Sequence, residues 1–313
     1  MPADTGASLG PVAEWVDLLD PSPEELRAHL PEGVHPRALE QLLAPTEHDD
    51  EPRPKLEGHG NYIFGVFLVP RVVPEEDRIY YQELDHIGTR TTLLTVRKTP
   101  ENGEPFDISE ARKSCREDEG VGMYVYHLVD DMAECYLDVI DALNAEIDEV
   151  EDNVEQWDPG KTRQRVSDLR HDLLHIRRIL SPMRDAIRAV VDDRVELDDG
   201  LPLMTREVEL NFAAAYDKFL RAYDGLELSR DLVAGVRDYL QSKISNDQNE
   251  VMKKLTVIAS VLLLPTFIVG LYGQNFRHHF PELGWQWGYG WSWGLIVLTT
   301  IAQLVFFRRK KWI

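Results

Sequence analysis

The stretch Gly273-Gln274-Asn275 places a glycine and two carboxamides directly after a long apolar segment, Leu255 to Tyr272, whose eighteen residues carry no charge. Carboxamide and carbonyl oxygens are ligands for hard cations. Mg²⁺ gives up its hydration water reluctantly, so neutral oxygens that contact its hydration shell are a suitable binding chemistry. We therefore expect Gln274 and Asn275 to meet a hydrated cation. Gly273 would let the backbone turn and bring its carbonyl close to that ion.

A stripe of small and polar residues leads up to these carboxamides. Steps of four and three residues, taken alternately from Asp238, give an average spacing of 3.5, the period of helices that supercoil side by side. The stripe consists of Asp238, Ser242, Ser245, Asn249, Met252, Thr256, Ala259, Leu263, Thr266, Gly270 and Gly273. An apolar seam would be typical of a coiled coil, but this face is mostly small or polar, even within the apolar segment.

Two interpretations of this stripe remain open. Small residues within a membrane helix usually indicate close helix packing, whereas polar ones can line a water-filled path. The second interpretation is favoured because the stripe continues through Asp238 and Asn249 outside the apolar segment and ends at the carboxamides. One chain with two spans cannot enclose a pore, so several copies would surround an axis with this face inward.

Two segments are long enough to cross a membrane. Between Lys254 and Arg277 lie 22 uncharged residues, and between Glu282 and Arg308 lie 25 more. A hydrocarbon core of about 30 Å needs about 20 helical residues. We predict membrane helices at 254–275 and 289–307, joined by an outer loop at 276–288 that holds His278, His279 and Glu282.

Basic residues indicate the orientation of these spans. Lys253 and Lys254 precede the first span, and a basic tail, 308–313, contains Arg308 to Lys311 after the second. Lys and Arg are enriched on the cytoplasmic side. We therefore expect a multi-pass protein of the cytoplasmic membrane with both termini in the cytosol.

The rest of the chain is strongly acidic. Residues 1–250 carry 27 basic and 54 acidic side chains, and the whole chain has a net charge of −21. This argues against a nucleic-acid partner, which needs a basic surface. The sequence contains neither a phosphate-binding glycine loop nor a nucleophile–base motif, so we do not expect an enzyme. Cys115 and Cys135 are isolated and suggest reduced thiols, and the lone His59 and His86 read as surface or core residues.

The elements of this acidic part predict its organisation. Residues 1–125 read as a mixed α/β domain, with strands in 61–69, 78–88 and 90–98 and helices in 22–30 and 35–43. Residues 126–198 have helical periodicity broken at 158–160 and predict an antiparallel hairpin of an acidic arm and an arginine-rich arm, the second kinked at Pro182. Residues 199–253, with Thr205 as N-cap, predict a stalk continuous with the first span. The fold class is thus an α+β membrane protein.

At these residues the chain resembles the CorA family of two-span divalent-cation channels. Residues 245–290 carry the patterns SNxxNxxMKxLT, Pro265-Thr266, GxYGxNF and PELxWxWGY, and the chain ends in KKWI. Weaker similarity, such as RPKLE at 53–57, extends over most of the chain. The resemblance implies a homopentamer with a cytosolic α/β funnel, a helical hairpin and a long pore helix. Mg²⁺ would be the permeant and regulatory ion, with no further cofactor.

The resemblance also implies roles for single residues. Asn275 would receive the hydrated ion beside Gln274 and Gly273. The pore would be lined by Gly270, Thr266, Leu263, Asn249 and Asp238, and a hydrophobic gate would comprise Met252, Leu255 and Leu263. Asp217 would remain from a regulatory site between subunits.

The chain departs from the family pattern at three places. Gln274 stands where the usual signature Gly-Met-Asn has methionine. Arg277, His278 and His279 follow the signature, where relatives often carry an acid. Ala214 stands where relatives carry a regulatory carboxylate. Two alternatives to a Mg²⁺, Co²⁺ or Ni²⁺ channel stay open: a Zn²⁺ transporter, which the two histidines would suit, and a membrane-anchored cation sensor that does not conduct.

Overall fold

The computed structural model describes residues 13–45, 51–73, 78–100, 103–195, 197, 203–274 and 284–312. The chain divides into two compact units, Met1–Val236 and Arg237–Ile313. The 67-residue helix α6 (Arg206–Tyr272) contributes its first part to one unit and its last part to the other. The predicted boundaries at 125/126 and 198/199 lie inside the first unit, because its sheet and helices share one hydrophobic core.

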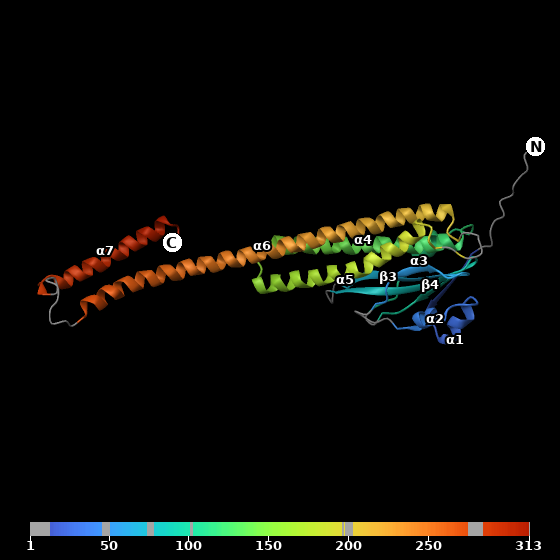
Figure 1. Ribbon diagram of the computed structural model, residues 1–313, viewed down its shortest axis with the longest axis horizontal. Coiled ribbons are helices and arrows are strands. Elements are labelled where there is room, and N and C mark those ends of the chain that lie inside the picture. The colour runs from blue at the N-terminus through green and yellow to red at the C-terminus, as the bar shows by residue number, and fades with distance from the viewer. Residues whose placement is uncertain are drawn as a thin grey trace, which may run out of the picture. The chain divides into compact units, whose positions relative to one another are not determined.

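The first unit is built on a five-stranded sheet with the order β1-β5-β4-β3-β2 (Figure 1). The strands are β1 (Glu14–Leu19), β2 (Lys55–Gly58), β3 (Ile63–Val73), β4 (Arg78–Gly88) and β5 (Thr92–Arg97). β1 runs parallel to β5, and the other pairs are antiparallel. The three predicted strands are confirmed as β3, β4 and β5, whereas β1 and β2 were not predicted.

Helices cover both faces of this sheet (Figure 1). The short helices α1 (Pro23–His29) and α2 (Pro36–Leu43) form a small core with one face through Leu26 and Leu42. On the other face lie α3 (Ser109–Ser114), α4 (Val121–Asn153), α5 (Pro159–Val191) and the first part of α6. Both short helices were predicted, and the Ser22 side chain caps α1 by accepting from the Glu25 N–H at 3.2 Å.

The helices α4 and α5 form the predicted hairpin. Asp158 caps α5 through the N–H groups of Gly160 and Lys161, and Pro159 occupies the first helical position, where its missing N–H costs nothing. Arg165 on α5 and Glu146 on α4 pair at 2.7 Å, so opposite charges join the two arms. Pro182 lies inside α5, which the structure assigns as one continuous helix.

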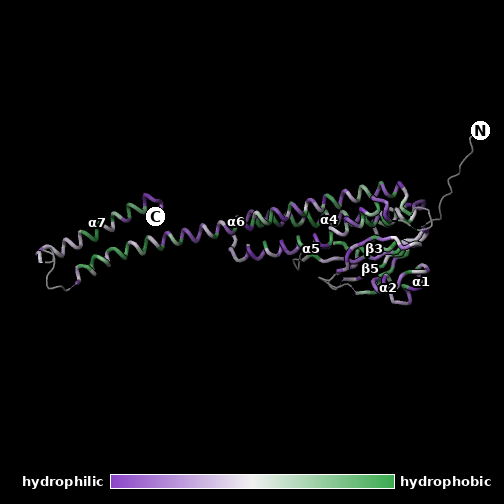
Figure 2. The backbone as a smooth tube through the Cα atoms, in the orientation of Figure 1, coloured by the Kyte–Doolittle hydropathy of each residue, from purple (hydrophilic) through white to green (hydrophobic). Residues whose placement is uncertain are grey.

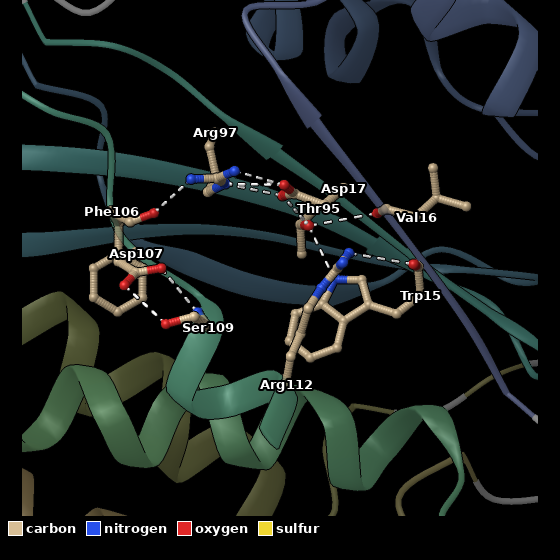
Figure 3. A network of polar contacts seen from close by, with 9 residues as sticks. All are labelled: Trp15, Val16, Asp17, Thr95, Arg97, Phe106, Asp107, Ser109 and Arg112. Carbon is tan, nitrogen blue, oxygen red and sulfur yellow. Dashed lines mark hydrogen bonds and ion pairs between the residues drawn. The ribbon is translucent and has the colours of Figure 1, made fainter. Parts of the chain in front are cut away.

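A polar network fixes the edge strand β1 to the rest of this unit (Figure 3). Arg97 of β5 donates to both carboxylate oxygens of Asp17, with the shortest contact at 2.7 Å, and to the carbonyl of Phe106. The Trp15 indole donates to the Thr95 hydroxyl at 3.0 Å. The paired guanidinium and carboxylate thereby connect β1, β5 and the segment that leads into α3.

The second unit consists of the end of α6 and the helix α7 (Gly288–Arg309), which are both long and apolar enough to cross a membrane. Both segments are mostly hydrophobic, whereas the preceding part of α6 alternates between hydrophilic and hydrophobic residues (Figure 2). The predicted first span ended at 275, but the helix ends at Tyr272 and Gly273 forms a turn.

Candidate functional site: the uncovered face of α6

One face of α6 packs against α7. Val257, Ile268 and Phe307 are buried, and Ser260, Leu264 and Gln303 are half-buried, whereas most other residues of α7 and of α6 from Val251 onward are exposed in the single chain. The Gln303 amide of α7 donates to the Ser260 carbonyl of α6 at 3.1 Å. Successive residues of an α-helix are about 100° apart, so residues 257, 260, 264 and 268 share this covered face.

The predicted stripe lies elsewhere on the helix. At 100° per residue the centre of its membrane part, Thr256 to Gly273, is about 135° away from the face that α7 covers. All eleven stripe residues, from Asp238 to Gly273, are exposed in the single chain. The gate candidates are also uncovered: Leu263 is 71% exposed, and Met252 and Leu255 are more than half exposed. The side chains of α7 therefore leave this face free for other copies or for water.

The two threonines of the stripe present acceptor oxygens. The Thr256 hydroxyl donates to the Met252 carbonyl at 2.8 Å, and the Thr266 hydroxyl donates to the Leu262 carbonyl at 2.7 Å. Since the hydroxyl proton is used within the helix, the remaining lone pairs of each oxygen can accept from another group. A hydrated cation presents outward-pointing water protons, which such oxygens can accept.

None of the residues that the structure describes lies close enough to Gly270 to require a glycine there. A Cβ atom built there would meet nothing within 4 Å. Packing inside one chain therefore does not explain the small residue, whereas close approach of further copies or passage of an ion would.

At the mouth of the helix, the Gly273 N–H still bonds to the Val269 carbonyl at 2.9 Å. Gly273 does not adopt a positive φ, so the expected turn forms without the left-handed conformation that only glycine tolerates easily. Gln274 is exposed beyond it. Asn275, His278, His279 and Glu282 lie outside the described residues.

The acidic candidates occupy separate places. Asp238 is exposed and pairs with the neighbouring Arg237 at 3.1 Å. Asn249 is exposed on the stripe one turn before Met252. Asp217 lies in the part of α6 that belongs to the first unit, where it is exposed one turn after Ala214. Among the described candidates, Asp238 and Asn249 thus lie on the exposed stripe of the second unit, and Asp217 occupies an exposed position of the first unit.

The same spacing continues upstream of Asp238, beyond the predicted stripe. Alternating steps back from Asp238 reach a further set of exposed residues: Gly235, Asp231, Leu228, Asp224, Arg221, Asp217, Ala214, Leu210 and Glu207. The buried residues of this part, such as Phe212 and Phe219, belong to the core of the first unit. Extending the 3.5-residue period to the start of α6 would have identified this face.

Comparison with known proteins agrees with this architecture. The family profile described as CorA-like Mg²⁺ transporter protein matches residues 12–309. The chain belongs to the CorA family. The cobalt/magnesium transport protein CorA of Thermotoga maritima is 31% identical over 288 residues, which cover 90% of this chain and 77% of that protein.

Further relatives match over similar lengths. A putative metal ion transporter of Bacillus subtilis is 28% identical over 95% of this chain and 89% of its own length. The complete structure of the CorA magnesium transporter of Methanocaldococcus jannaschii superposes with a TM-score of 0.76 at 23% identity and covers 96% of this chain and 91% of that one. The fold predicted from the sequence, with a soluble α/β part, long helices and two membrane helices, is thus confirmed.

Proposed function

We propose that this chain is one subunit of a homopentameric channel that conducts hydrated divalent cations, above all Mg²⁺, across the cytoplasmic membrane. The observation that carries this proposal is the small and polar face of α6, uncovered from Asp238 to Gly273 and turned away from α7. A polar face of this length in a membrane helix needs water or other polar surfaces against it. Copies arranged around an axis provide both.

The chemistry of this face indicates which ions it can conduct. The described part of the stripe offers neutral oxygens and, at Asp238, a carboxylate, and it offers neither thiolates nor imidazoles. Oxygen ligands suit Mg²⁺, and a path wide enough for a hydrated Mg²⁺ ion also admits hydrated Co²⁺. Relatives that match over most of the chain are named for cobalt and magnesium transport. The protein is a transporter and not an enzyme in this proposal.

Orientation and regulation complete the proposal. The basic residues that flank both spans support cytosolic termini. The Asn275 carboxamides of the copies, with Gln274 and Gly273 beside them, receive the ion at the outer mouth, near His278, His279 and Glu282. Met252, Leu255 and Leu263 narrow the path as apolar rings, and Mg²⁺ on the acidic cytosolic face, including Asp217, regulates opening.

Flux measurements test this function directly. Proteoliposomes that contain the purified protein and an internal Mg²⁺ dye should take up Mg²⁺, and external Co²⁺ should compete more effectively than Zn²⁺. Asn275→Ala should remove most of the flux while the oligomer still elutes intact, because one substitution removes a carboxamide from every copy. Asn153→Ala, an exposed carboxamide at the end of α4, is the control.

Three results would contradict the proposal. Wild-type flux in Asn275→Ala would exclude the signature as the ion entrance. Uptake of Zn²⁺ in preference to Mg²⁺ would assign the protein to zinc transport. The absence of flux for all three ions, in a protein that still binds them, would indicate a sensor that does not conduct.

A further inference from the structure

Three side chains capable of ligating a metal meet at the junction of α3 and α4. They lie outside the proposed pore face of α6, which is the exposed stripe from Asp238 to Gly273. Cys115 caps the C-terminus of α3, Glu119 lies in the short segment that follows, and His127 lies two turns into α4. The Cys115 sulfur, a Glu119 carboxylate oxygen and a His127 ring nitrogen all lie within 4.8 Å of one another. In the sequence Cys115 reads as isolated, because the other two potential ligands come four and twelve residues later and no short motif joins the three.

Local contacts hold these groups in place. The backbone N–H of Arg116 donates to Glu119 Oε2 at 3.1 Å, and the same oxygen lies 2.9 Å from His127 Nε2. The Cys115 thiol donates to the Ala111 carbonyl at 3.2 Å. The His127 and Glu119 side chains are only 15% and 11% exposed. The three ligands are therefore positioned by α3 and α4 in a partly shielded place that solvent ions can still reach.

The Glu119–His127 contact alone would be an ordinary ion pair. The Cys115 sulfur adds a third potential ligand, within 4.8 Å of the other two ligand atoms, which an ion pair does not need. Acidic and basic groups both surround the three side chains: Arg116 Nε lies 3.7 Å from Glu119 Oε1, while Oε2 of the same carboxylate faces His127.

We propose that Cys115, Glu119 and His127 form a site for a transition-metal ion of the Zn²⁺, Co²⁺ or Ni²⁺ type. A combination of sulfur, nitrogen and oxygen ligands prefers such ions and discriminates against Mg²⁺. Three protein ligands leave a fourth position for water in tetrahedral geometry. On binding, the sulfur coordinates as thiolate and its proton passes to solvent.

This site goes beyond the proposed function, because none of its residues lies on the pore face of α6. A bound ion would join the end of α3 to the first turns of α4 and thereby restrict the conformations of the segment between them. It would make the cytosolic unit responsive to a transition metal even when Mg²⁺ is abundant.

Co²⁺ titration of the full-length oligomer in detergent, with Mg²⁺ in large excess, tests the proposal. Thiolate coordination produces sulfur-to-cobalt charge-transfer absorption in the near ultraviolet, which oxygen ligands in the pore cannot produce. One Co²⁺ per subunit should generate this band, and added Zn²⁺ should abolish it. Cys115→Ser should remove the band, whereas Cys135→Ser, the matched control on α4, should retain it.

A second pair of variants separates coordination from folding. His127→Gln and Glu119→Gln should each weaken Co²⁺ binding by at least about tenfold, since even changes behind the first ligands cost about 10–100-fold. His171→Gln, on α5, should leave binding unchanged. Elution volume and circular dichroism establish that each variant is folded. No thiolate band in the wild-type protein, or a band that survives Cys115→Ser in a folded oligomer, would overturn the proposal.

Discussion

Thr266 is the residue of the proposed pore face whose chemistry can be tested most cleanly. Its hydroxyl proton is committed to the Leu262 carbonyl, and so its oxygen faces outward as an acceptor. Thr299 on α7 makes the same kind of bond to Leu295, at 2.8 Å, but lies half-buried away from the stripe. The two threonines thus differ mainly in what surrounds their side chains.

We predict that Thr266→Val lowers Mg²⁺ flux by at least about fivefold, because each copy loses a water-mediated contact worth about 0.5–1.5 kcal/mol. The substitution preserves the shape of the side chain. Thr299→Val should change flux little, and uptake by proteoliposomes measures both. Equal effects of the two variants would mean that this face of α6 packs against protein and does not line a water-filled path.

His86 carries a second prediction at the residue scale. The ring is fully buried between Phe67 and Gly65, so tightly that a Cβ at Gly65 would lie 1.9 Å from its Cε1 atom. Burial lowers the pKa of His86 to about 3. In the unfolded chain the ring takes up a proton below about pH 6.5 while the folded ring stays neutral, so this group destabilises the protein as pH falls from 6.5 towards 3.

The stability of the wild-type protein should therefore fall on acidification by up to about 1.4 kcal/mol per pH unit from this group. His86→Leu removes that contribution. The difference in Tm between pH 7 and pH 5 should be smaller in His86→Leu than in the wild type. His29→Leu, at an exposed position on α1, should keep the full difference. An unchanged difference in His86→Leu would show that the ring is hydrated or protonated when folded.

At the scale of elements, the sheet depends on one buried cation. Lys98, just after β5, lies 2.5 Å from Glu83 and 3.0 Å from Asp85 of β4, and all three side chains are almost completely buried. Its ammonium also donates to the Gln41 carbonyl of α2 at 2.7 Å. Burial, and then repulsion by Glu83, raise the pKa of Asp85 well above its usual range. Lys98 therefore compensates two carboxyl groups and ties α2 to the sheet.

Lys98→Met should lower the free energy of unfolding by about 3–5 kcal/mol at pH 7, since it leaves buried acids without a cation. The pKa of Asp85 is raised by burial, so this carboxyl takes up a proton more readily in the folded state, and the loss should shrink at pH 5. The triple variant Lys98→Met, Glu83→Gln, Asp85→Asn should recover most of the Tm at pH 7. If the single variant were as stable as the wild type, the cluster would already be neutral.

The elements also show which strands and helices can be predicted from sequence patterns alone. β3, β4 and β5 were predicted because their β-branched and aromatic runs are long and bounded by turns, and the caps Ser22 and Thr205 marked two helices correctly. β1 and β2 escaped prediction because six- and four-residue edge strands are defined by their partners. β1 becomes a strand by pairing in parallel with β5, about eighty residues away, and by the Asp17–Arg97 contact.

At the scale of the whole molecule, the 3.5-residue period of α6 predicted a helix face that other residues of the same chain do not cover. In the structure the residues of this face are exposed. The period could not predict what fills that face, because neighbouring copies contribute contacts that no single sequence pattern encodes. The acidic part of the chain adds a further constraint. Copies whose residues 1–250 each carry an excess of acids repel one another unless cations gather between them.

This repulsion leads to a prediction about Mg²⁺ regulation. Ala214 and Asp217 are exposed one turn apart on α6, and Asp224 and Asp231 follow on the same face. Ala214→Asp would add one carboxylate per copy to this surface and make a bridging cation more favourable. We predict that the Mg²⁺ concentration for half-maximal thermal stabilisation of the oligomer falls about two- to fivefold, which corresponds to about 0.5–1 kcal/mol per exposed charge.

Two variants decide whether position or charge produces this effect. Asp217→Ala should shift the half-maximal Mg²⁺ concentration in the opposite direction, because it removes a ligand from the same face. Ala145→Asp adds the same charge at an exposed position of α4 and should shift it little. Protease protection measured against Mg²⁺ concentration provides an independent reading of the same equilibrium. If Ala214→Asp and Ala145→Asp gave identical curves, Mg²⁺ would act only on overall charge, and the first part of α6 would not form a regulatory contact between copies.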